Sequence, residues 1–533
     1  MANALLSIRQ LELAFQDHKV VDGISFDIFA GETFALVGES GSGKSLTALA
    51  VMRLLPVAAT MKAAAIDLAG VNLLKLPELE VCRIRGRRLG FIFQDPMSSL
   101  NPVMTIGAQI AEVLTIHFQL TPSEVKQRVL ALLEQVEIPD PERRVNVYPH
   151  QLSGGQRQRV MIAIALAAKP DILIADEPTT ALDVTIQAQI LALLKSIQQQ
   201  TGMALWLISH DLALVSNIAD RIAVMQRGKI VETATAASFF QQPQHPYSLK
   251  LLAALPNMQS CQNKPLQSQA DLLKVNDFKV YYPIRTGLFQ RVVGHVKAVD
   301  GVSLVLPQAS TLALVGESGC GKTSLAKALV NLLPAHGGSM CLNGVDLTQL
   351  SGEALRLKRA EIQIIFQDPF AAMNPRMLVG DIIAEGLKAL HPEISQAQRQ
   401  QQVADLLIQV DLPEQAALRY PHEFSGGQRQ RICIARALAV KPKLIICDEP
   451  TSALDVSVQA QIIDLLKKLQ QQQGLSYLLI THNLGVVAEM ADQVAVMFAG
   501  KIVEQGPVEQ VLMRPQHDYT KELIEALPRL KSV

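Results

Sequence analysis

The chain has 533 residues, more than one compact domain usually contains. Lysine plus arginine and aspartate plus glutamate both total 49, so the basic excess of a typical nucleic-acid-binding protein is missing. The six cysteines form no CxxC pair and no cluster, which argues against zinc and iron–sulfur ligation and favours a reducing compartment. No run of 18 apolar residues occurs, so we expect no membrane-spanning helix, and the strand-like start at Leu6 predicts no secretory signal.

The two halves of the chain open in the same way, with a strand that carries an aromatic residue. These strands are expected at residues 11–15 and 278–282, and an Asp-Gly pair follows each. Asp22 and Asp300 each lie sixteen residues before a glycine-rich loop. The second half has about eleven additional residues between its strand and Asp300. An extended hairpin and a solvated loop are both compatible with this insertion.

A glycine-rich loop follows the apolar strand at residues 34–37, and the same pattern recurs in the second half. Helical periodicity resumes at Ser45, so the loop stands between a strand and a helix, as a phosphate-binding loop requires. We expect Lys44 and Lys322 to reach the β- and γ-phosphates of ATP, and Ser45 and Thr323 to offer a hydroxyl to Mg²⁺. The predicted ATP-binding residues of the loops are Gly38, Glu39, Ser40, Gly41, Ser42, Gly43, Lys44 and Ser45, and Gly316, Glu317, Ser318, Gly319, Cys320, Gly321, Lys322 and Thr323.

Two acidic residues end a continuous apolar run in each half, at residues 172–175 and 444–447. Such runs fit parallel strands buried on both faces. Asp176 and Asp448 would then stand at the edge of the sheet where phosphate sits, and could hold hydrated Mg²⁺. Glu177 and Glu449 are the candidate general bases that polarise water for attack on the γ-phosphate. Elsewhere an Asp-Glu pair is usually just solvated, but the apolar strand favours the functional interpretation.

A Ser-Gly-Gly-Gln motif lies 23 residues before that aspartate in both halves (176 − 153 and 448 − 425). Glycines allow close approach of a ligand, and a serine that starts a helix can cap the helix or bind a phosphate oxygen. Alone, the motif would indicate only a helix start, but its constant spacing argues for function. Its ATP-binding candidates are Ser153, Gly154, Gly155 and Gln156, and Ser425, Gly426, Gly427 and Gln428.

The repeat predicts two domains and a linker. Helical patterns near 121–137 and 393–410 predict a small helical subdomain in each half. Residues 257–270 are rich in Gln, Asn, Ser and Pro, as a linker would be. We therefore predict a nucleotide-binding domain at 1–256, a linker at 257–271 and a second nucleotide-binding domain at 272–533.

Taken together, these motifs make nearly all of the chain resemble a tandem ABC-type ATPase. The resemblance implies an α/β fold with two tandem P-loop ABC nucleotide-binding domains, each a mixed, mostly parallel sheet with a helical subdomain. It also implies roles for residues outside the motifs described so far. Those are Gln94 and Gln367 at Mg²⁺ and water, Asp183 and Asp455 in the loop linking the sites, His210 and His482 as γ-phosphate sensors, and Phe15 and Tyr282 stacking on adenine.

The same resemblance implies that the two domains pair within the molecule. ATP on the first loop would be closed by the second Ser-Gly-Gly-Gln motif, and ATP on the second loop by the first. Since neither half lacks an essential group, we predict two hydrolytic sites. Two departures stand out, namely Asn483 where the first half has Asp211, and Cys320 inside a phosphate loop. We hypothesise that phosphate-binding N–H groups lower the pKa of the Cys320 thiol and that its alkylation blocks the site; an inert loop residue is the alternative.

Further motifs resemble the ATP-binding subunits of fused peptide and nickel importers. They are Gln94-Asp95-Pro96 with Asn101-Pro102, repeated at Gln367 and Asn374, and a tail His245-Pro246-Tyr247, echoed at His517-Asp518-Tyr519. The resemblance implies a peripheral ATPase on the cytoplasmic face of the inner membrane, two permease subunits docked after Gln94 and Gln367, and an extracytoplasmic solute-binding protein. Only Cys261 lies near the place where many relatives bind an iron–sulfur cluster, so we predict no cluster.

A soluble tandem ABC ATPase acting on ribosomes is the main alternative. Such proteins carry a long charged helical arm between their halves, whereas residues 257–270 contain a single lysine, Lys264. A DNA-repair ATPase would need zinc-binding cysteines or a basic surface. We therefore favour the importer, with no nucleic-acid partner, and leave its solute open.

Overall fold

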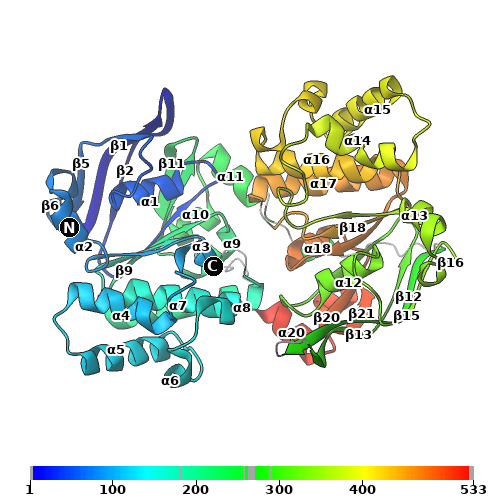
Figure 1. The fold of residues 1–533 in the computed structure, drawn as a ribbon. Helices are drawn as coiled ribbons and strands as arrows, with labels where there is room; N and C mark the ends of the chain where they lie inside the picture. The colour runs from blue at the N-terminus through cyan, green and yellow to red at the C-terminus, as the bar shows by residue number, and fades with distance from the viewer. Residues whose placement is uncertain are drawn as a thin grey trace. The chain divides into compact units, whose positions relative to one another are not determined.

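A computed structural model describes residues 4–179, 182–253, 255, 258–261, 270–286, 291–452 and 454–526. The chain divides after residue 254 into two compact units, called unit 1 and unit 2 below (Figure 1). Most of the predicted linker lies outside the described residues, so its extent stays a prediction. Of its described residues, the 3₁₀ helix η3 (Met258–Cys261) packs in unit 2 with the Cys261 side chain fully buried, and Asp271 already begins a strand of that unit.

The core of unit 1 is a six-stranded sheet in the order β11-β10-β3-β9-β8-β7. Its strands are parallel except that β11 pairs with β10 in the antiparallel sense. The strands that lead to the phosphate loop and to the acidic pair are buried along their whole length, which explains their continuous apolar sequences. The strands of this sheet are β3 (Thr33–Val37), β7 (Leu89–Ile92), β8 (Ile172–Asp176), β9 (Ala204–Ser209), β10 (Arg221–Gln226) and β11 (Lys229–Thr235).

Unit 2 repeats this sheet in the equivalent order, β21-β20-β14-β19-β18-β17. Again all neighbouring strands are parallel except the pair β20–β21. The predicted α/β core with a mixed, mostly parallel sheet is therefore confirmed in both units. Its strands are β14 (Thr311–Val315), β17 (Ile362–Ile365), β18 (Leu444–Asp448), β19 (Ser476–Ile480), β20 (Gln493–Phe498) and β21 (Lys501–Pro507).

A second, antiparallel sheet lies beside each core sheet. In unit 1 its order is β2-β1-β5-β6, with β4 also paired to β1, and in unit 2 it is β13-β12-β15-β16. The strands are β1 (Leu6–Phe15), β2 (His18–Ile28), β4 (Ala59–Lys62), β5 (Ala65–Leu68), β6 (Val71–Asn72), β12 (Asp271–Thr286), β13 (Arg291–Pro307), β15 (Gly337–Leu342) and β16 (Val345–Asp346).

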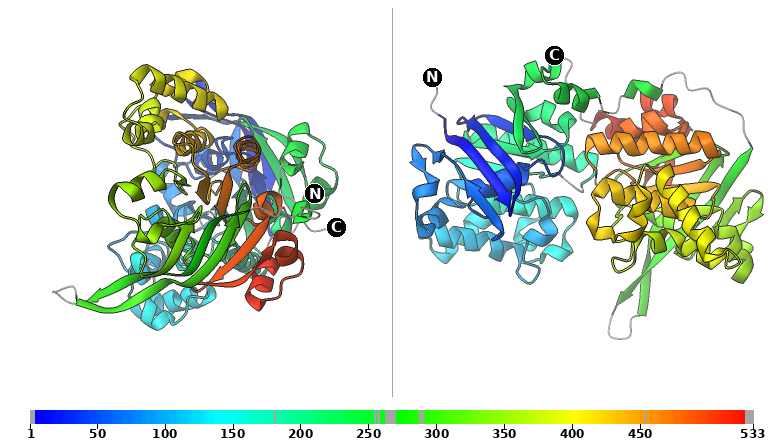
Figure 2. Two further views of the ribbon diagram at one scale, coloured as in Figure 1. Left: turned by 90° about the vertical axis from the view of Figure 1, so that its right-hand side faces the viewer. Right: turned by 90° about the horizontal axis from the view of Figure 1, so that it is seen from above.

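The inserted residues of the second half form an extended hairpin. β12 and β13 stay in antiparallel register out to the pair Thr286 and Arg291, and this ribbon projects from the body of unit 2 (Figure 2). Of the two interpretations left open by the sequence, the hairpin is the observed one. Its outer residues are nevertheless exposed, including Ile284, Val292 and Val293.

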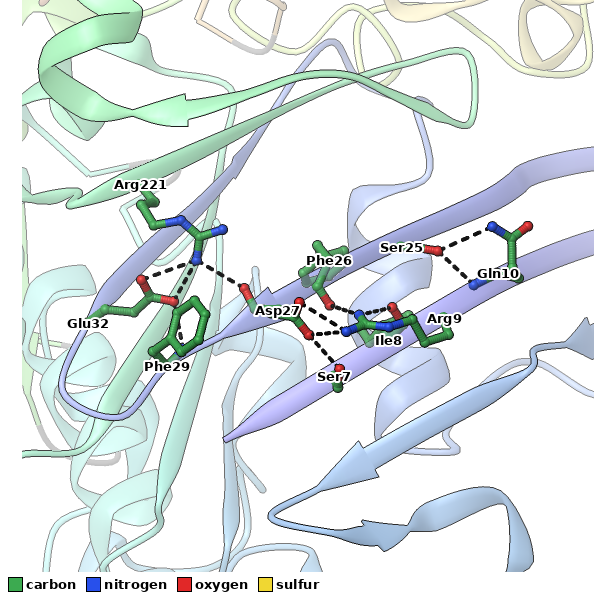
Figure 3. A network of polar contacts seen from close by, with 10 residues as sticks. All are labelled: Ser7, Ile8, Arg9, Gln10, Ser25, Phe26, Asp27, Phe29, Glu32 and Arg221. Atoms are coloured by element: carbon green, nitrogen blue, oxygen red, sulfur yellow. Dashed lines mark hydrogen bonds and ion pairs between the residues drawn. The ribbon is translucent and has the colours of Figure 1, made fainter. Parts of the chain in front are cut away.

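A polar network joins the antiparallel sheet of unit 1 to its core sheet (Figure 3). Arg221 on β10 donates to the backbone oxygen of Asp27 at 3.2 Å and to the Glu32 carboxylate at 3.1 Å, and its guanidinium lies over the Phe29 ring. The Asp27 carboxylate in turn accepts two hydrogen bonds from Arg9, at 2.7 and 3.0 Å. Strands of the two sheets are thereby held together by charge-assisted bonds.

Helices cover the sheets, and the two longest of those described, α8 and α17, were not predicted from the sequence. The helical stretches predicted near 121–137 and 393–410 correspond to α5 in unit 1 and α15 in unit 2, and the structure adds α4 and α14 directly before them (Figure 1). No helix among the described ranges is both long and apolar enough to cross a bilayer. The helices of unit 1 are α1 (Lys44–Val51), η1 (Leu73–Lys75), α2 (Glu78–Ile84), α3 (Pro96–Ser99), α4 (Ile106–His117), α5 (Pro122–Gln135), α6 (Pro141–Arg144), η2 (Pro149–Gln151), α7 (Gly154–Leu166), α8 (Val184–Thr201), α9 (Leu212–Ile218), α10 (Ala236–Gln241) and α11 (Pro246–Ala253). Those of unit 2, besides η3, are α12 (Lys322–Leu329), η4 (Leu347–Gln349), α13 (Gly352–Arg359), α14 (Val379–Leu390), α15 (Gln396–Gln409), η5 (Glu414–Leu418), η6 (Pro421–Glu423), α16 (Gly426–Leu438), α17 (Val456–Gln473), α18 (Leu484–Met490), α19 (Val508–Met513) and α20 (Asp518–Glu525).

Candidate functional site

Each phosphate loop joins the end of a buried strand to the start of a helix, β3 to α1 in unit 1 and β14 to α12 in unit 2. The first glycine of each loop, Gly38 or Gly316, has φ of 151°. A Cβ atom at Gly38 would lie 2.1 Å from the backbone oxygen of Met225, and one at Gly316 would lie 2.2 Å from that of Met497. No other residue fits there, since the backbone of the neighbouring strand closes the space.

The loop lysine is held close to the backbone of its own loop. In unit 1 the Lys44 amine donates to the backbone oxygens of Gly38 and Glu39, at 2.8 and 2.9 Å. In unit 2 the Lys322 amine makes the same two bonds, each at 2.7 Å. Both lysines are buried, so their charge stands beside the loop N–H groups, where an anion binds.

The loop hydroxyl and the strand aspartate meet in both units. Ser45 Oγ donates to Asp176 Oδ1 at 2.9 Å, and Thr323 Oγ1 donates to Asp448 Oδ1 at 3.2 Å. Burial raises the pKa of Asp176 to about 6 and also raises that of Asp448. A hydroxyl and a carboxylate oxygen beside a phosphate loop are the hard ligands that Mg²⁺ takes, so these residues fit the ion.

The acidic residue that follows each aspartate is bound by a glutamine and a histidine. Glu177 accepts from Gln94 Nε2 at 2.9 Å, and its other oxygen lies 3.1 Å from His210 Nδ1. In unit 2, Glu449 accepts from Gln367 at 2.8 Å and lies 3.3 Å from His482 Nδ1. In each unit a glutamine and a histidine from two other segments thus meet at the glutamate carboxylate, although the three segments are far apart in the sequence.

Both glutamates adopt a backbone conformation that is uncommon for a residue with a side chain. Their φ angles are 47° for Glu177 and 49° for Glu449, in the left-handed region. Hydrogen bonds from their N–H groups to Ile208 and Ile480 hold this backbone in place. Strain of this kind is frequent at active sites. Burial alone would raise the pKa of Glu449, but the hydrogen bond and charge of His482 hold that pKa below its ordinary value.

Comparison with known proteins agrees with this geometry. The family model described as "ABC transporter" matches residues 21–180 and 299–452, more than half of the chain. The chain belongs to the ABC transporter family. A second model, "Oligopeptide/dipeptide transporter, C-terminal region", matches residues 231–284 and 503–533.

Curated ABC transporter proteins match this chain from end to end. It is 50% identical over 537 residues to the peptidoglycan transport ATP-binding protein YejF of Agrobacterium fabrum, an alignment that covers 99% of this chain and 97% of that protein. It is 45% identical over 561 residues to the glutathione import ATP-binding protein GsiA of Escherichia coli K12, which covers 99% and 90%. A solved ATP-binding cassette with ADP and Pi aligns with a TM-score of 0.40 and 25% identity, over 44% of this chain and 99% of that one.

The two family models and the two relatives confirm the tandem ABC assignment made from the sequence and its fused importer type. ABC transporter ATP-binding proteins are ATPases coupled to transport, so the activity of this chain is ATP hydrolysis. None of these relatives is a ribosome-associated factor, and that alternative has no support.

The Ser-Gly-Gly-Gln motifs, called the signature motifs below, have the same local structure in the two units. Ser153 caps α7 by accepting from the backbone N–H of Gln156, and Ser425 caps α16 by accepting from that of Gln428. The glutamine side chain accepts from the serine N–H in return, which forms a capping box. Asp183 and Asp455 stand at the start of α8 and α17, while Ala181 and Ala453 before them lie outside the described residues. The roles of these motifs in ATP binding stay predictions.

The two aromatic residues expected to stack on adenine differ in their surroundings. Tyr282 is 39% exposed, and its hydroxyl lies 3.2 Å from Ser324 Oγ, one residue beyond Thr323 at the start of α12. This contact places Tyr282 beside the phosphate loop of unit 2. Phe15 is half-buried as the last residue of β1. Their stacking on adenine stays a prediction.

The expectation of a lowered pKa for Cys320 is wrong. Burial raises the pKa of this thiol above its ordinary value, and the charge of Lys322 offsets the effect only in part. Cys320 is 8% exposed and packs against Gly316, at the place that Ser42 takes in unit 1. The sequence showed the neighbouring N–H groups but not the burial, which is the larger effect here.

The exchange of Asp211 for Asn483 leaves the local structure unchanged. Asp211 Oδ1 accepts from the N–H groups of Ala213 and Leu214 at the start of α9, and Asn483 Oδ1 accepts from those of Gly485 and Val486 at the start of α18. Both residues cap the helix with the same oxygen. This departure therefore gives no reason to doubt the equivalence of the two sites.

One contact to the phosphate loops was not predicted from the sequence. The hydroxyl of Tyr247 on α11 accepts from the N–H of Glu39 at 3.3 Å, and that of Tyr519 on α20 accepts from the N–H of Glu317 at 2.9 Å. The sequence had shown both tyrosines only as parts of a repeated tail. Their constant distance from the other motifs, 272 residues (519 − 247), was the signal that could have found them.

Proposed function

We propose that this chain hydrolyses ATP to energise a membrane importer of peptides or related small solutes. The observation that supports the proposal is that both units bring the loop hydroxyl to the strand aspartate and a glutamine to the glutamate, combined with two regions that match the oligopeptide/dipeptide transporter C-terminal model. The relatives named for peptidoglycan transport and glutathione import agree with this solute class.

The proposed chemistry assigns one task to each side chain around the glutamates. Lys44 and Lys322 leave their backbone oxygens to bind the β- and γ-phosphates, and the loop N–H groups bind the remaining oxygens. Glu177 and Glu449 polarise the attacking water, with His210 and His482 beside the γ-phosphate. Mg²⁺, held by Ser45 and Asp176 or by Thr323 and Asp448, with Gln94 or Gln367 nearby, would neutralise charge on the phosphate oxygens.

A groove on unit 2 is suited to receive a permease segment. It has a volume of about 320 Å³, and its lining includes Phe366, the residue that directly precedes Gln367. The sequence had led us to expect permease docking just after Gln367. Its lining combines apolar side chains with two arginines, so an amphipathic helix with an acidic end would complement it. The lining residues are Val330, Leu332, Arg356, Arg359, Ala360, Ile362, Gln363, Ile364, Phe366 and Leu390.

The partners and location follow from this function as part of the proposal. The chain would lie on the cytoplasmic face of the inner membrane, bound to two permease subunits and, through them, served by an extracytoplasmic solute-binding protein. Closure of each ATP by the signature motif of the other unit is implied by the family resemblance and stays a prediction. If the severed units, kept apart, hydrolyse ATP at the full rate, that prediction is wrong.

Uptake in living cells tests the proposal. Cells that lack this chain should lose accumulation of labelled peptides, and the wild-type chain should restore it, whereas the variant Glu177→Gln/Glu449→Gln should not. Copurification from detergent-solubilised membranes should yield two permease proteins. Cofractionation with ribosomes, and uptake that is unaffected by loss of the chain, would contradict the proposal.

A further inference from the structure

The peptide unit between the first two residues of each phosphate loop is held from both sides. On one side, its carbonyl oxygen, Gly38 or Gly316, accepts from the loop lysine. On the other side, its N–H, that of Glu39 or Glu317, donates to a tyrosine hydroxyl of the tail. Without nucleotide, the lysine bond and the tyrosine bond both hold this peptide plane, and rotation of the plane would break both. Once the lysine turns to the phosphates, the tyrosine bond is the one of the two that remains.

The tyrosines are themselves fixed. Tyr247 and Tyr519 are 6% and 7% exposed, so their hydroxyls have little freedom to move away from the loop. Tyr519 packs in the core of unit 2, where its ring centroid lies 4.3 Å from that of Phe498. A buried tyrosine hydroxyl that accepts one defined N–H acts as a fixed support for the loop.

The helix that carries each tyrosine is anchored by the same construction in the two units. In unit 1, Glu232 on β11 accepts from the N–H groups of Gln244 and His245, at 2.9 and 3.0 Å, just before α11. In unit 2, Glu504 accepts from Gln516 and His517 at 2.9 and 3.1 Å, just before α20. Burial by itself would raise the pKa of both glutamates. The Thr520 side chain and the two backbone bonds at Glu504, and the two backbone bonds and the Ser248 side chain at Glu232, hold each pKa below its ordinary value.

The helices also begin in the same way despite one difference in sequence. His245 Nδ1 and His517 Nδ1 accept from the N–H groups of Tyr247 and Tyr519, each at 3.2 Å. The next residue, proline in unit 1 and Asp518 in unit 2, is in both cases the first residue of the helix. Proline and aspartate are both favoured there, for different reasons, so the weaker echo in the sequence still gives the same helix.

We propose that Tyr247 and Tyr519 are positioning residues, through which the carboxyl-terminal segment of each unit holds its phosphate loop in the conformation that binds ATP. The proposal rests on the nucleotide sites assigned above and adds the part of the chain that controls them. In each unit the anchoring glutamate, the histidine and the tyrosine described above all lie within the regions that match the oligopeptide/dipeptide transporter C-terminal model. That segment is thereby linked to the chemistry of the ATPase domain through a hydrogen bond.

The test removes the two hydroxyls and nothing else. In Tyr247→Phe/Tyr519→Phe the N–H of the loop loses its acceptor, the loop samples other conformations, and the fraction able to bind ATP falls. We expect the Kd for a fluorescent ATP analogue and the KM for ATP to rise about threefold to tenfold, with kcat changed less than about twofold. Because the Tyr519 bond is shorter, Tyr519→Phe alone should have a larger effect than Tyr247→Phe alone.

Tyr477→Phe is the matched control. It also removes one buried tyrosine hydroxyl, which donates to the backbone oxygen of Leu466 at 2.9 Å in the core of unit 2. It should lower the Tm without changing the KM. The variants Glu232→Gln and Glu504→Gln weaken the helix anchor while leaving the hydroxyls in place. They should also raise the KM for ATP, by a smaller factor than Tyr247→Phe/Tyr519→Phe does.

The outcomes separate this proposal from the assignment of the nucleotide sites. If the wild-type chain binds the analogue but Tyr247→Phe/Tyr519→Phe binds it equally well, or if Tyr477→Phe changes the KM as much, the positioning role is wrong. If Lys44→Ala/Lys322→Ala binds the analogue as tightly as the wild type, the assigned nucleotide sites are wrong instead.

Discussion

Gln94 donates its side-chain amide to the Glu177 carboxylate at 2.9 Å, and Gln367 and Glu449 repeat this bond at 2.8 Å. The glutamine follows β7 or β17, and the glutamate follows the neighbouring strand β8 or β18. Because parallel strands end at the same edge of the sheet, residues more than 80 apart in the sequence come into contact there. In both units the carboxylate is contacted by this glutamine and by a histidine, which leads to the first prediction.

Both sites should contribute to ATP hydrolysis. Glu177→Gln and Glu449→Gln each keep the hydrogen-bonding shape of the side chain but remove the base, so each single variant should lower phosphate release. The double variant should lose at least about 100-fold, the usual contribution of a general base. ATP binding, measured separately, should be retained in all three variants.

A half-buried glutamate away from the assigned sites provides the control for these substitutions. Glu489 forms an ion pair with Lys467 at 2.6 Å on unit 2, and Glu489→Gln should leave phosphate release unchanged. An unchanged rate in either Glu177→Gln or Glu449→Gln would show that only one of the two sites hydrolyses ATP.

Alkylation of Cys320 should be slow, contrary to what the loop sequence suggested. Burial limits access to this thiol and raises its pKa, so less thiolate is present at neutral pH than for an ordinary cysteine. The exposed Cys82 of unit 1 should react with iodoacetamide first. The labelling rate of Cys320 should keep rising as the pH is raised through 9, since the thiolate fraction is still increasing there.

Mass spectrometry of timed digests gives both labelling rates in one sample. Cys320→Ser identifies the peptide and should retain ATP hydrolysis, since Ser42 takes the same place in the loop of unit 1. Labelling of Cys320 at neutral pH as fast as that of Cys82 would overturn the inert interpretation and restore the reactive one.

Charge at the cap of α18 should change stability but not activity. Asn483→Asp keeps the oxygen that accepts from Gly485 and Val486 and adds a negative charge at the helix N-terminus. We expect the free energy of unfolding to rise by about 0.3–1 kcal/mol. Phosphate release should stay within about twofold of the wild type, measured at saturating ATP. A large loss of activity would mean that Asn483 has a role beyond capping.

The sequence predicted those parts of the site that depend on local pattern and on repetition. Glycine loops, buried strands and the acidic pair each have a local signature, and their recurrence in order made coincidence negligible. Burial and long-range contact have no such signature. The pKa of Cys320 was therefore predicted in the wrong direction, and the bond from Tyr247 to Glu39 was missed because it joins residues 208 positions apart.

The hairpin shows the same limit. Residue count alone could not decide between a ribbon and a loop after Tyr282, because about eleven additional residues fit either one. Strand register, which the structure supplies, continues the pairing out to Thr286 and Arg291. A ribbon of two strands without a covering helix is marginal in water, and here it continues strands that are anchored in a larger sheet.

The final prediction concerns the stability of unit 1 and uses its tryptophan. Trp206 is the only tryptophan of the chain, is fully buried, and lies edge-on to Phe26 with ring centroids 5.4 Å apart. Its fluorescence therefore reports the unfolding of unit 1. Arg221→Gln removes the guanidinium that joins Asp27, Glu32 and Phe29, and should lower the free energy of unfolding of unit 1 by about 1–2 kcal/mol.

Unit 2 supplies the control for Arg221→Gln, because its equivalent position already carries a glutamine, Gln493. Gln493 starts β20 as Arg221 starts β10, but Val305 and Ser310 stand where unit 1 has Asp27 and Glu32. An arginine there would find no carboxylate at those two positions, so Gln493→Arg should change the unfolding free energy by less than about 0.5 kcal/mol. Urea titrations followed by Trp206 fluorescence for unit 1 and by circular dichroism for the whole chain measure both. A loss in Gln493→Arg as large as that in Arg221→Gln would show that any substitution at this position lowers the stability, and that the bonds of Arg221 across the two sheets do not account for the effect.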